Sequence, residues 1–233
     1  MIESLEMSPT TKERILDAAE TLFAEQGFTN TSLRSLTAQA KANLAAVNYH
    51  FGSKDELIEA MFARRMTPMN QERLSRLEAL ESQYRGQKIP LESLVEAFIG
   101  PALELSRDTT QGGSLFIKLL GRSYAEPSPQ LQDRVRAMHC EVIERFKTAF
   151  TVALPNLSSD ELYWRLHFLV GALAYCMSGA DMIRLIASCR ITNPLEAESM
   201  TQRLTVFVTA GLRAPQTSGE DRQMDAIRPA VSA

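Results

Sequence analysis

Hydrophobic residues recur at helical spacing from the beginning of the chain. Over residues 10–27 they fall on one helical face, and Thr10 and Glu13 have the spacing of a capping box. Thr31 or Ser32 can cap a second helix, and Asn43 can cap a third. The first sixty residues therefore predict three packed helices, of which the second and third are short.

The pattern stays helical beyond residue 52, with no alternation of period two. Ser53 can cap a fourth helix that bends at Pro68 and runs to about residue 84. Further helices are predicted over residues 90–107, 114–124, 128–153, 158–187 and 194–212. The predicted fold is all-α, with a helix-turn-helix domain at residues 10–62, a helical domain at 63–213, a flexible N-terminus at 1–9 and a disordered tail at 214–233.

Composition narrows the class of protein. Hydrophobic residues make up 45% of the 233 residues and charged residues 23%, which is close to the globular average. The longest apolar run, residues 168–177, is far shorter than the roughly 18 residues of a membrane span. The N-terminus also lacks the apolar segment of a signal peptide. We therefore expect a cytoplasmic protein that does not associate with membranes.

The sequence shows no pattern typical of an enzyme or a metal site. Cys140, Cys176 and Cys189 are widely spaced without a C-x-x-C motif, so we expect reduced, buried thiols and no bound metal. The three histidines are scattered, and no nucleophile elbow, phosphate loop or H-E-x-x-H motif is present. We expect no catalytic residue and no cofactor.

One segment is basic although the chain is acidic. The net charge is −3, yet residues 28–54 contain Arg34, Lys41 and Lys54 and no Asp or Glu. This segment spans two short helices that are joined by a tight turn and packed on a third. That is the geometry of a helix-turn-helix unit, whose second helix enters the major groove of DNA. Residues 44–50 are the predicted recognition helix.

The predicted recognition helix combines residues for reading bases with residues for binding phosphate. Leu44, Val47 and Phe51 are expected to point inward, which places Ala46 and Tyr49 on the outer face. Asn48 could pair with adenine, and the alanines allow close approach to base edges. Tyr49, His50 and Lys54 are better suited to phosphate, and Lys54 lies beside a helix N-terminus. The expected DNA contacts are Thr31, Ser32, Arg34, Leu44, Ala45, Ala46, Asn48, Tyr49, His50 and Lys54. A packing role for Tyr49 and His50 fits the same spacing.

Four segments of this region resemble the TetR family of regulators. They read ILDAA at 15–19, LFAEQGF at 22–28, TSLR at 31–34 and YHFGSKDEL at 49–57, and the match runs from about residue 12 to 62. The resemblance implies a regulator that binds double-stranded DNA as a homodimer and holds a small molecule among its C-terminal helices. One departure is Lys41-Ala42, where the family often has Gly-Val. Glycine is preferred there for a left-handed backbone, so Lys41 should cost some stability while adding charge near DNA.

The resemblance also implies roles in the C-terminal half. The last two long helices should form the dimer interface, with Leu162, Leu166, Leu169, Leu173, Leu204, Phe207 and Val208 as candidates. The candidate lining of a pocket for a hydrophobic effector is Phe98, Phe116, Leu119, Leu120, Tyr124, Trp164, His167 and Phe168. A place in the monomer core suits the apolar members of both sets equally well. Arg122, Arg165 or His167 could pair with an acidic ligand head or be satisfied within the protein.

A narrower resemblance concerns the effector. NLAAVNYHFGSK at 43–54 and LYWRLHF at 162–168 are similar to the PsrA-type branch, which responds to long-chain fatty acids. This implies a repressor that leaves a pseudopalindromic operator when a fatty acid or acyl-CoA binds. Two alternatives stay open. One is an unrelated hydrophobic effector, and the other is a helical protein-binding adaptor, whose affinity would not fall steeply with salt as DNA binding does.

Overall fold

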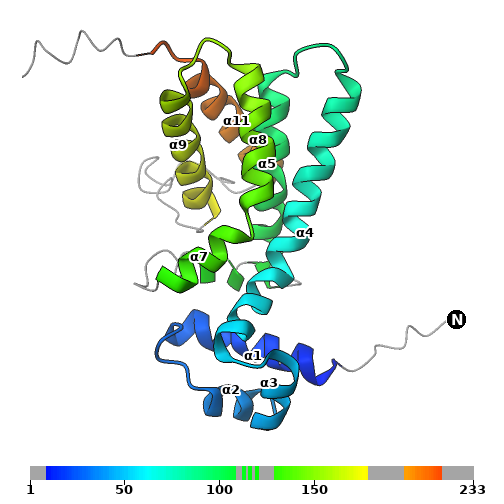
Figure 1. Ribbon diagram of the computed structural model, residues 1–233, viewed down its shortest axis with the longest axis vertical. Helices are drawn as coiled ribbons and strands as arrows, with labels where there is room; N and C mark the ends of the chain where they lie inside the picture. The colour runs from blue at the N-terminus through cyan, green and yellow to red at the C-terminus, as the bar shows by residue number, and fades with distance from the viewer. Residues whose placement is uncertain are drawn as a thin grey trace, which may run out of the picture.

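The computed structural model describes residues 9–108, 112–113, 115–116, 119–120, 129–177 and 197–216. Every regular element in these ranges is a helix, which confirms the all-α prediction (Figure 1). The helices are α1 (Thr11–Gln26), α2 (Leu33–Gln39), α3 (Leu44–Phe51), α4 (Lys54–Gln83), α5 (Leu91–Arg107), α7 (Pro129–Ala137), α8 (Cys140–Ala153), α9 (Ser159–Met177) and α11 (Ala197–Arg213). Residues 1–8, most of the predicted helix at 114–124, residues 178–196 and the tail beyond residue 216 lie outside the described residues.

Side-chain caps set the beginnings of the first four helices. Thr10 accepts a hydrogen bond from the Glu13 N–H, and the Glu13 carboxylate accepts one from the Thr10 N–H, as the predicted capping box requires. Ser32, Asn43 and Ser53 each accept from the backbone N–H three residues further on. Each cap of this kind contributes about 1 kcal/mol. The two caps left open at the start of α2 are thus resolved in favour of Ser32.

The turn between α2 and α3 is built around a left-handed residue. Lys41 has φ 48°, its N–H donates to Ala38 O at 3.3 Å, and the Ala42 N–H donates to Thr37 O at 3.0 Å. These two bonds form a Schellman motif, in which glycine is the usual left-handed residue. The expected conformation at Lys41 is confirmed. Arg14 of α1 holds the same turn, because its Nε donates to Ala40 O at 3.2 Å.

Helix α4 belongs to both halves of the molecule. Its first turns pack on α1 and α3, and its later turns pack on α5, α7 and α8 (Figure 1). It continues through Pro68 as a single helix. Near its N-terminal end, the Phe62 ring lies 5.9 Å from that of Phe28 and 6.3 Å from that of Phe116. The predicted domain boundary at residue 62 therefore lies within α4.

The predicted helix at 128–153 is wrong in one respect, since it is two helices. Helix α7 ends at Ala137 and α8 begins at Cys140. At the break, Asn70 of α4 donates from Nδ2 to Met138 O at 2.9 Å and lies 3.3 Å from His139 Nδ1. In a continuous helix the Met138 carbonyl would accept a hydrogen bond from within the helix, but here it accepts one from Asn70 of α4. Cys140 is exposed, contrary to the expectation of a buried thiol.

Candidate DNA interface and effector cavity

Helix α3 presents a polar and aromatic outer face at the end of the molecule opposite the α4–α5 connection (Figure 1). Tyr49 is 86% exposed, Ala45 and Asn48 are exposed, and Val47 and Phe51 are buried as predicted. Leu44 was expected inward, but it is half exposed because it begins the helix beyond the edge of the core. Ala46 was expected on the outer face, but it is partly buried against the core.

Two of the predicted DNA contacts are engaged inside the domain. The Thr31 side chain is fully buried, and its hydroxyl donates to Gly27 O at 2.8 Å. The Lys54 ammonium donates to Phe28 O at 2.6 Å and lies 5.9 Å from the Phe23 ring centroid. Both side chains fix the loop before α2 to the helices around it. Thr31 is therefore a structural residue, and Lys54 directs its ammonium into the domain rather than outward to phosphate.

The remaining predicted contacts lie on α3 and at the beginning of α2. Ser32 and Arg34 are exposed at the beginning of α2, and Lys41 is exposed in the turn. His50 is half-buried, with its ring edge-on to that of Tyr49 at 5.1 Å. Phosphate contacts position a protein on DNA, and base contacts in the groove specify sequence. In this arrangement Arg34 and Lys41 are available for phosphate contacts, and the outer face of α3 is available for base contacts.

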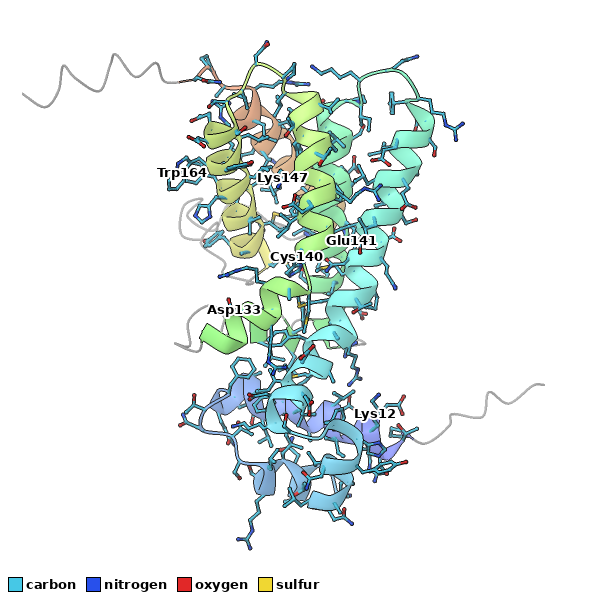
Figure 2. All side chains as sticks on the ribbon, in the orientation of Figure 1. Lys12, Asp133, Cys140, Glu141, Lys147 and Trp164 are labelled. Carbon is cyan, nitrogen blue, oxygen red and sulfur yellow. The ribbon has the colours of Figure 1, made fainter. Side chains whose placement is uncertain are left out.

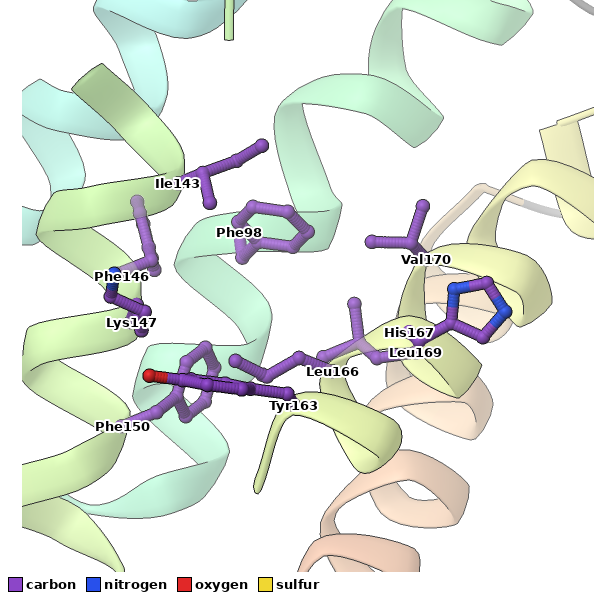
Figure 3. A pocket seen from close by; sticks show the side chains of 10 residues that line it. All are labelled: Phe98, Ile143, Phe146, Lys147, Phe150, Tyr163, Leu166, His167, Leu169 and Val170. Atoms are coloured by element: carbon purple, nitrogen blue, oxygen red, sulfur yellow. The ribbon is translucent and has the colours of Figure 1, made fainter. Parts of the chain in front are cut away.

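Two adjoining cavities lie among the C-terminal helices. The outer cavity, about 300 Å³, lies between α5, α8 and α9 (Figure 3). Its lining is Phe98, Ile143, Phe146, Lys147, Phe150, Tyr163, Leu166, His167, Leu169 and Val170. The inner cavity, about 120 Å³, also reaches α4, and its lining is Met69, Arg73, Phe98, Ala102, Leu120, His139, Val142, Ile143, Val170, Leu173, Ala174 and Met177. Both are predominantly apolar, and they share three residues.

The predicted ligand-binding residues divide between the cavities, the core and the surface. Phe98 lines both cavities, His167 the outer one and Leu120 the inner one. Phe116 and Leu119 are buried in the core and line neither cavity. Trp164 and Phe168 are exposed on the other side of α9, where Trp164 points away from the bundle (Figure 2). Tyr124 and Arg122 lie outside the described residues.

The polar end of the inner cavity, formed by Arg73, was not among the residues predicted from the sequence. Arg73 is 4% exposed, its Nε donates to Phe98 O at 2.8 Å, and its Nη1 donates to Asn70 Oδ1 at 3.3 Å. Its guanidinium also lies 4.4 Å from the Phe98 ring centroid, within the range of a cation–π contact. The signal was present, because Arg73 shares the buried face of α4 with Met66, Met69 and Leu77.

The pKa of His139 is lowered from 6.5 to about 4, because burial disfavours the imidazolium and the positive charge of Arg73 adds to the effect. The unfolded chain therefore takes up this proton at a higher pH than the folded protein does. The contribution of neutral His139 to the free energy of unfolding is complete above pH 6.5. It is lost as the pH falls towards 4, which lowers the free energy of unfolding by up to about 3 kcal/mol.

We expect the His139→Gln variant to lose less stability than the wild-type protein between pH 7 and pH 4.5. Urea unfolding at several pH values measures the difference. Parallel pH profiles for the two proteins would show that His139 titrates normally.

The candidates for the dimer interface lie mostly in the monomer core. Leu162, Leu169 and Leu173 of α9 and Leu204 and Val208 of α11 are buried. Leu166 is half-buried and lines the outer cavity, so of the predicted set only Phe207 is exposed, at 71%. These two neighbouring helices expose large apolar side chains that do not line the outer cavity: Trp164, Phe168 and Tyr175 of α9, and Val206 and Phe207 of α11, of which Val206 lines a groove between α5 and α11. We term this set the α9/α11 face. The rings of Trp164 and Phe168 stack at 6.0 Å.

Arg165 serves the protein itself rather than an acidic ligand. It is 8% exposed, and its guanidinium donates to the carbonyl oxygens of Leu212 at 2.9 Å and Ala214 at 2.6 Å, as well as to those of Gly211 and Pro215. Its Nε donates to the Glu161 carboxylate at 2.8 Å. Cations at a helix C-terminus satisfy its last carbonyl groups and its dipole. Arg165 thus attaches the end of α11 to α9.

Comparisons with known proteins cover most of the chain. A model for bacterial regulatory proteins of the tetR family matches residues 15–61, and a model for the tetracyclin repressor-like C-terminal domain matches residues 96–211. The HTH-type transcriptional repressor Rv3405c of Mycobacterium tuberculosis is 46% identical over 57 residues, 23% of this chain. The nicotine-responsive repressor HdnoR of Paenarthrobacter nicotinovorans is 40% identical over 52 residues, 22% of this chain. These matches span only 30% and 27% of the two relatives.

Solved structures show a similar fold over nearly the whole chain. The repressor SmeT of Stenotrophomonas maltophilia has a TM-score of 0.58 and 21% identity, covering 89% of this chain and 95% of SmeT. The fatty acid degradation regulator FadR of Bacillus halodurans has a TM-score of 0.61 and 12% identity, covering 90% and 100%. In the part of the chain that the structure describes, no helix meets the length and hydropathy needed to cross a membrane.

Proposed function

The chain belongs to the TetR family of transcriptional regulators, and on that premise we propose that it represses transcription as a homodimer on a pseudopalindromic operator. The observation that carries the proposal is the outer face of α3, where Asn48 and Tyr49 are exposed, together with the exposed cations Arg34 of α2 and Lys41 of the turn between α2 and α3. In a dimer, two such helices would enter successive major grooves about 34 to 36 Å apart. Such a protein would act in the cytoplasm, where the DNA of a bacterium lies.

The α9/α11 face supports the dimer. Exposed aromatic side chains that are grouped on neighbouring helices are uncommon on a monomer, and they are enriched in protein interfaces. Trp164, Phe168 and Phe207 are each more than half exposed. A two-fold interface pairs the same surface on both subunits, so this one face is sufficient.

We further propose that a hydrophobic effector occupies the two cavities and releases the operator. The resemblance to the PsrA-type branch favours a long-chain fatty acid or acyl-CoA, and the apolar linings suit the hydrocarbon chain of either. The likeness to FadR, at 12% identity, concerns the fold alone. An unrelated hydrophobic effector is the alternative within this family.

Helix α4 provides the physical route from the cavities to the DNA-binding domain. Met69 and Arg73 of α4 line the inner cavity, and Phe62 of the same helix is buried in the core of the N-terminal domain. Ion pairs join α4 to the helices on either side of it: Arg65 pairs with Glu20 of α1 at 3.3 Å, and Glu59 pairs with Arg134 of α7. A ligand shifts such an equilibrium only if it binds one arrangement of the helices more tightly than the other. Release therefore requires the cavities to fit the effector better when the recognition helices are mis-spaced.

Selection of duplexes from a random pool by the purified protein tests the proposed function. The selection is repeated with tetradecanoate and with tetradecanoyl-CoA. We expect a pseudopalindrome that is lost when one of the lipids is added. A palindrome that neither lipid affects would leave the regulator and remove the fatty-acid effector. No enriched sequence at low salt would contradict operator binding and favour the adaptor alternative.

A further inference from the structure

We propose that the two cavities bind an amphipathic molecule with a free carboxylate, whose head contacts Arg73 in the inner cavity and whose hydrocarbon chain extends into the outer cavity. This inference rests on the proposed effector site and deepens it, because it selects a free acid over its thioester. It also fixes the direction in which the ligand lies.

The inner cavity has one polar end. Arg73 of α4 lines it, and among the described residues its polar neighbours include Asn70, which contacts the Arg73 guanidinium, and His139, which lies 3.3 Å from Asn70. The rest of the lining is apolar, with Met69, Ala102 and Val142 among its members. A guanidinium is the side chain best matched to a carboxylate, and the attraction is strong where water is excluded. Burial, and in second place the positive charge of Arg73, lowers the pKa of the neighbouring His139.

The outer cavity continues the path for an apolar chain. Phe98, Ile143 and Val170 line both cavities, and Figure 3 shows the Phe98 ring of α5 facing Ile143 of α8 and Val170 of α9. Beyond them, Phe150 and Leu166 extend the apolar wall. Lys147 is the cation at the outer cavity, where it pairs with Glu144 of its own helix. The two cavities thus offer two competing positions for a negative head, and burial favours Arg73.

An acyl-CoA does not fit the same orientation. Its thioester carries no charge for Arg73, and a coenzyme A group is far larger than an inner cavity of about 120 Å³. A fatty alcohol or a methyl ester would retain the apolar contacts and lose the ionic contact. Comparing the affinity of the alcohol or the ester with that of the free acid therefore separates the contribution of the charged head from that of the buried hydrocarbon chain.

Calorimetric titration of the full-length protein with tetradecanoate and with its methyl ester tests the proposal without any substitution. We expect the ester to bind about 10- to 100-fold more weakly, the loss typical of one charge-assisted hydrogen-bonded contact. Equal affinities, or no binding of either molecule, would overturn the proposal.

Variants of the two cavity cations test whether the ligand carboxylate binds at Arg73 or at Lys147. Arg73→Gln should weaken tetradecanoate binding about 10- to 100-fold and leave the affinity for the ester nearly unchanged. Lys147→Gln removes the cation of the outer cavity and should weaken tetradecanoate binding much less than Arg73→Gln does. Arg145→Gln, at a surface residue of α8 that lines neither cavity, is the control and should leave both affinities unchanged. Arg73→Lys retains the charge and should restore part of the affinity. A loss confined to Lys147→Gln would place the head at the outer cavity and contradict the proposal. If Arg73-dependent binding is found but tetradecanoate does not release DNA, the inference stands and the release mechanism of the proposed function fails.

Discussion

Replacing Phe168 and Phe207 together with glutamate is expected to convert the protein from a dimer into a monomer. Both side chains are more than half exposed on the α9/α11 face, so the monomer fold should tolerate the change. Truncating an aromatic residue at the centre of an interface costs about 2 kcal/mol or more, and a buried negative charge costs still more. Because a dimer gains avidity from two half-sites, operator affinity should fall at least about 100-fold. Sedimentation velocity and fluorescence anisotropy measure the two effects.

Val152→Glu is the matched control for this double substitution. Val152 is an exposed apolar residue of α8, outside the α9/α11 face, and receives the same charge. We expect this variant to remain dimeric and to bind the operator with wild-type affinity. A dimeric Phe168→Glu/Phe207→Glu protein would show that the subunits associate through another surface.

Replacing Arg165 with methionine is expected to lower the free energy of unfolding by about 3 kcal/mol. The substitution leaves the carbonyl groups at the end of α11 and the Glu161 carboxylate without their donor. Removing one partner of a buried charged network costs about 3 to 5 kcal/mol, and the partial exposure of Glu161 places this case at the lower end. For a chain of this size, that corresponds to a melting temperature lower by about 10 °C.

Arg145→Met is the control for the Arg165 substitution. Arg145 forms ion pairs with Glu78 and Glu81 at the surface, and pairs of this kind contribute at most about 1 kcal/mol. Thermal unfolding of both variants must be compared at one protein concentration, because dimerisation shifts the midpoint. If Arg165→Met is as stable as Arg145→Met, the attachment of α11 by Arg165 contributes little.

The N-terminal half was predictable because its signals are local. Thr10, Asn43 and Ser53 cap the helices that the sequence assigned to them, and Lys41 adopts the left-handed conformation that its place in the turn requires. A cap or a turn involves residues only a few positions apart, so its chemistry can be read directly from the sequence. Burial of Thr31 was not predictable in this way, because its hydroxyl is engaged by carbonyl groups of the preceding loop and helix.

The C-terminal half was harder to predict because α9 is apolar on nearly every face. Leu162 and Leu169 were expected at the dimer interface and are in the core, whereas Trp164 and Phe168 were expected to line a pocket and are exposed. Helical periodicity separates faces only where one of them is polar. The break at His139 and the burial of Arg73 depend on contacts between α4, α5 and α8, which are distant in sequence.

If the outer face of α3 reads a DNA sequence, the Asn48→Ala/Tyr49→Ala variant should lose far more affinity for the selected operator than for a scrambled duplex, and fluorescence anisotropy measures both affinities. The wild-type protein should prefer the operator at least about 1,000-fold. The variant should lose about 100-fold on the operator and much less on the scrambled duplex, because the phosphate contacts of Arg34 and Lys41 are retained. Arg85→Gln, at the exposed α4–α5 connection, should bind both duplexes like the wild-type protein. Equal operator affinity in the wild-type protein and the α3 variant would show that this face does not read the operator.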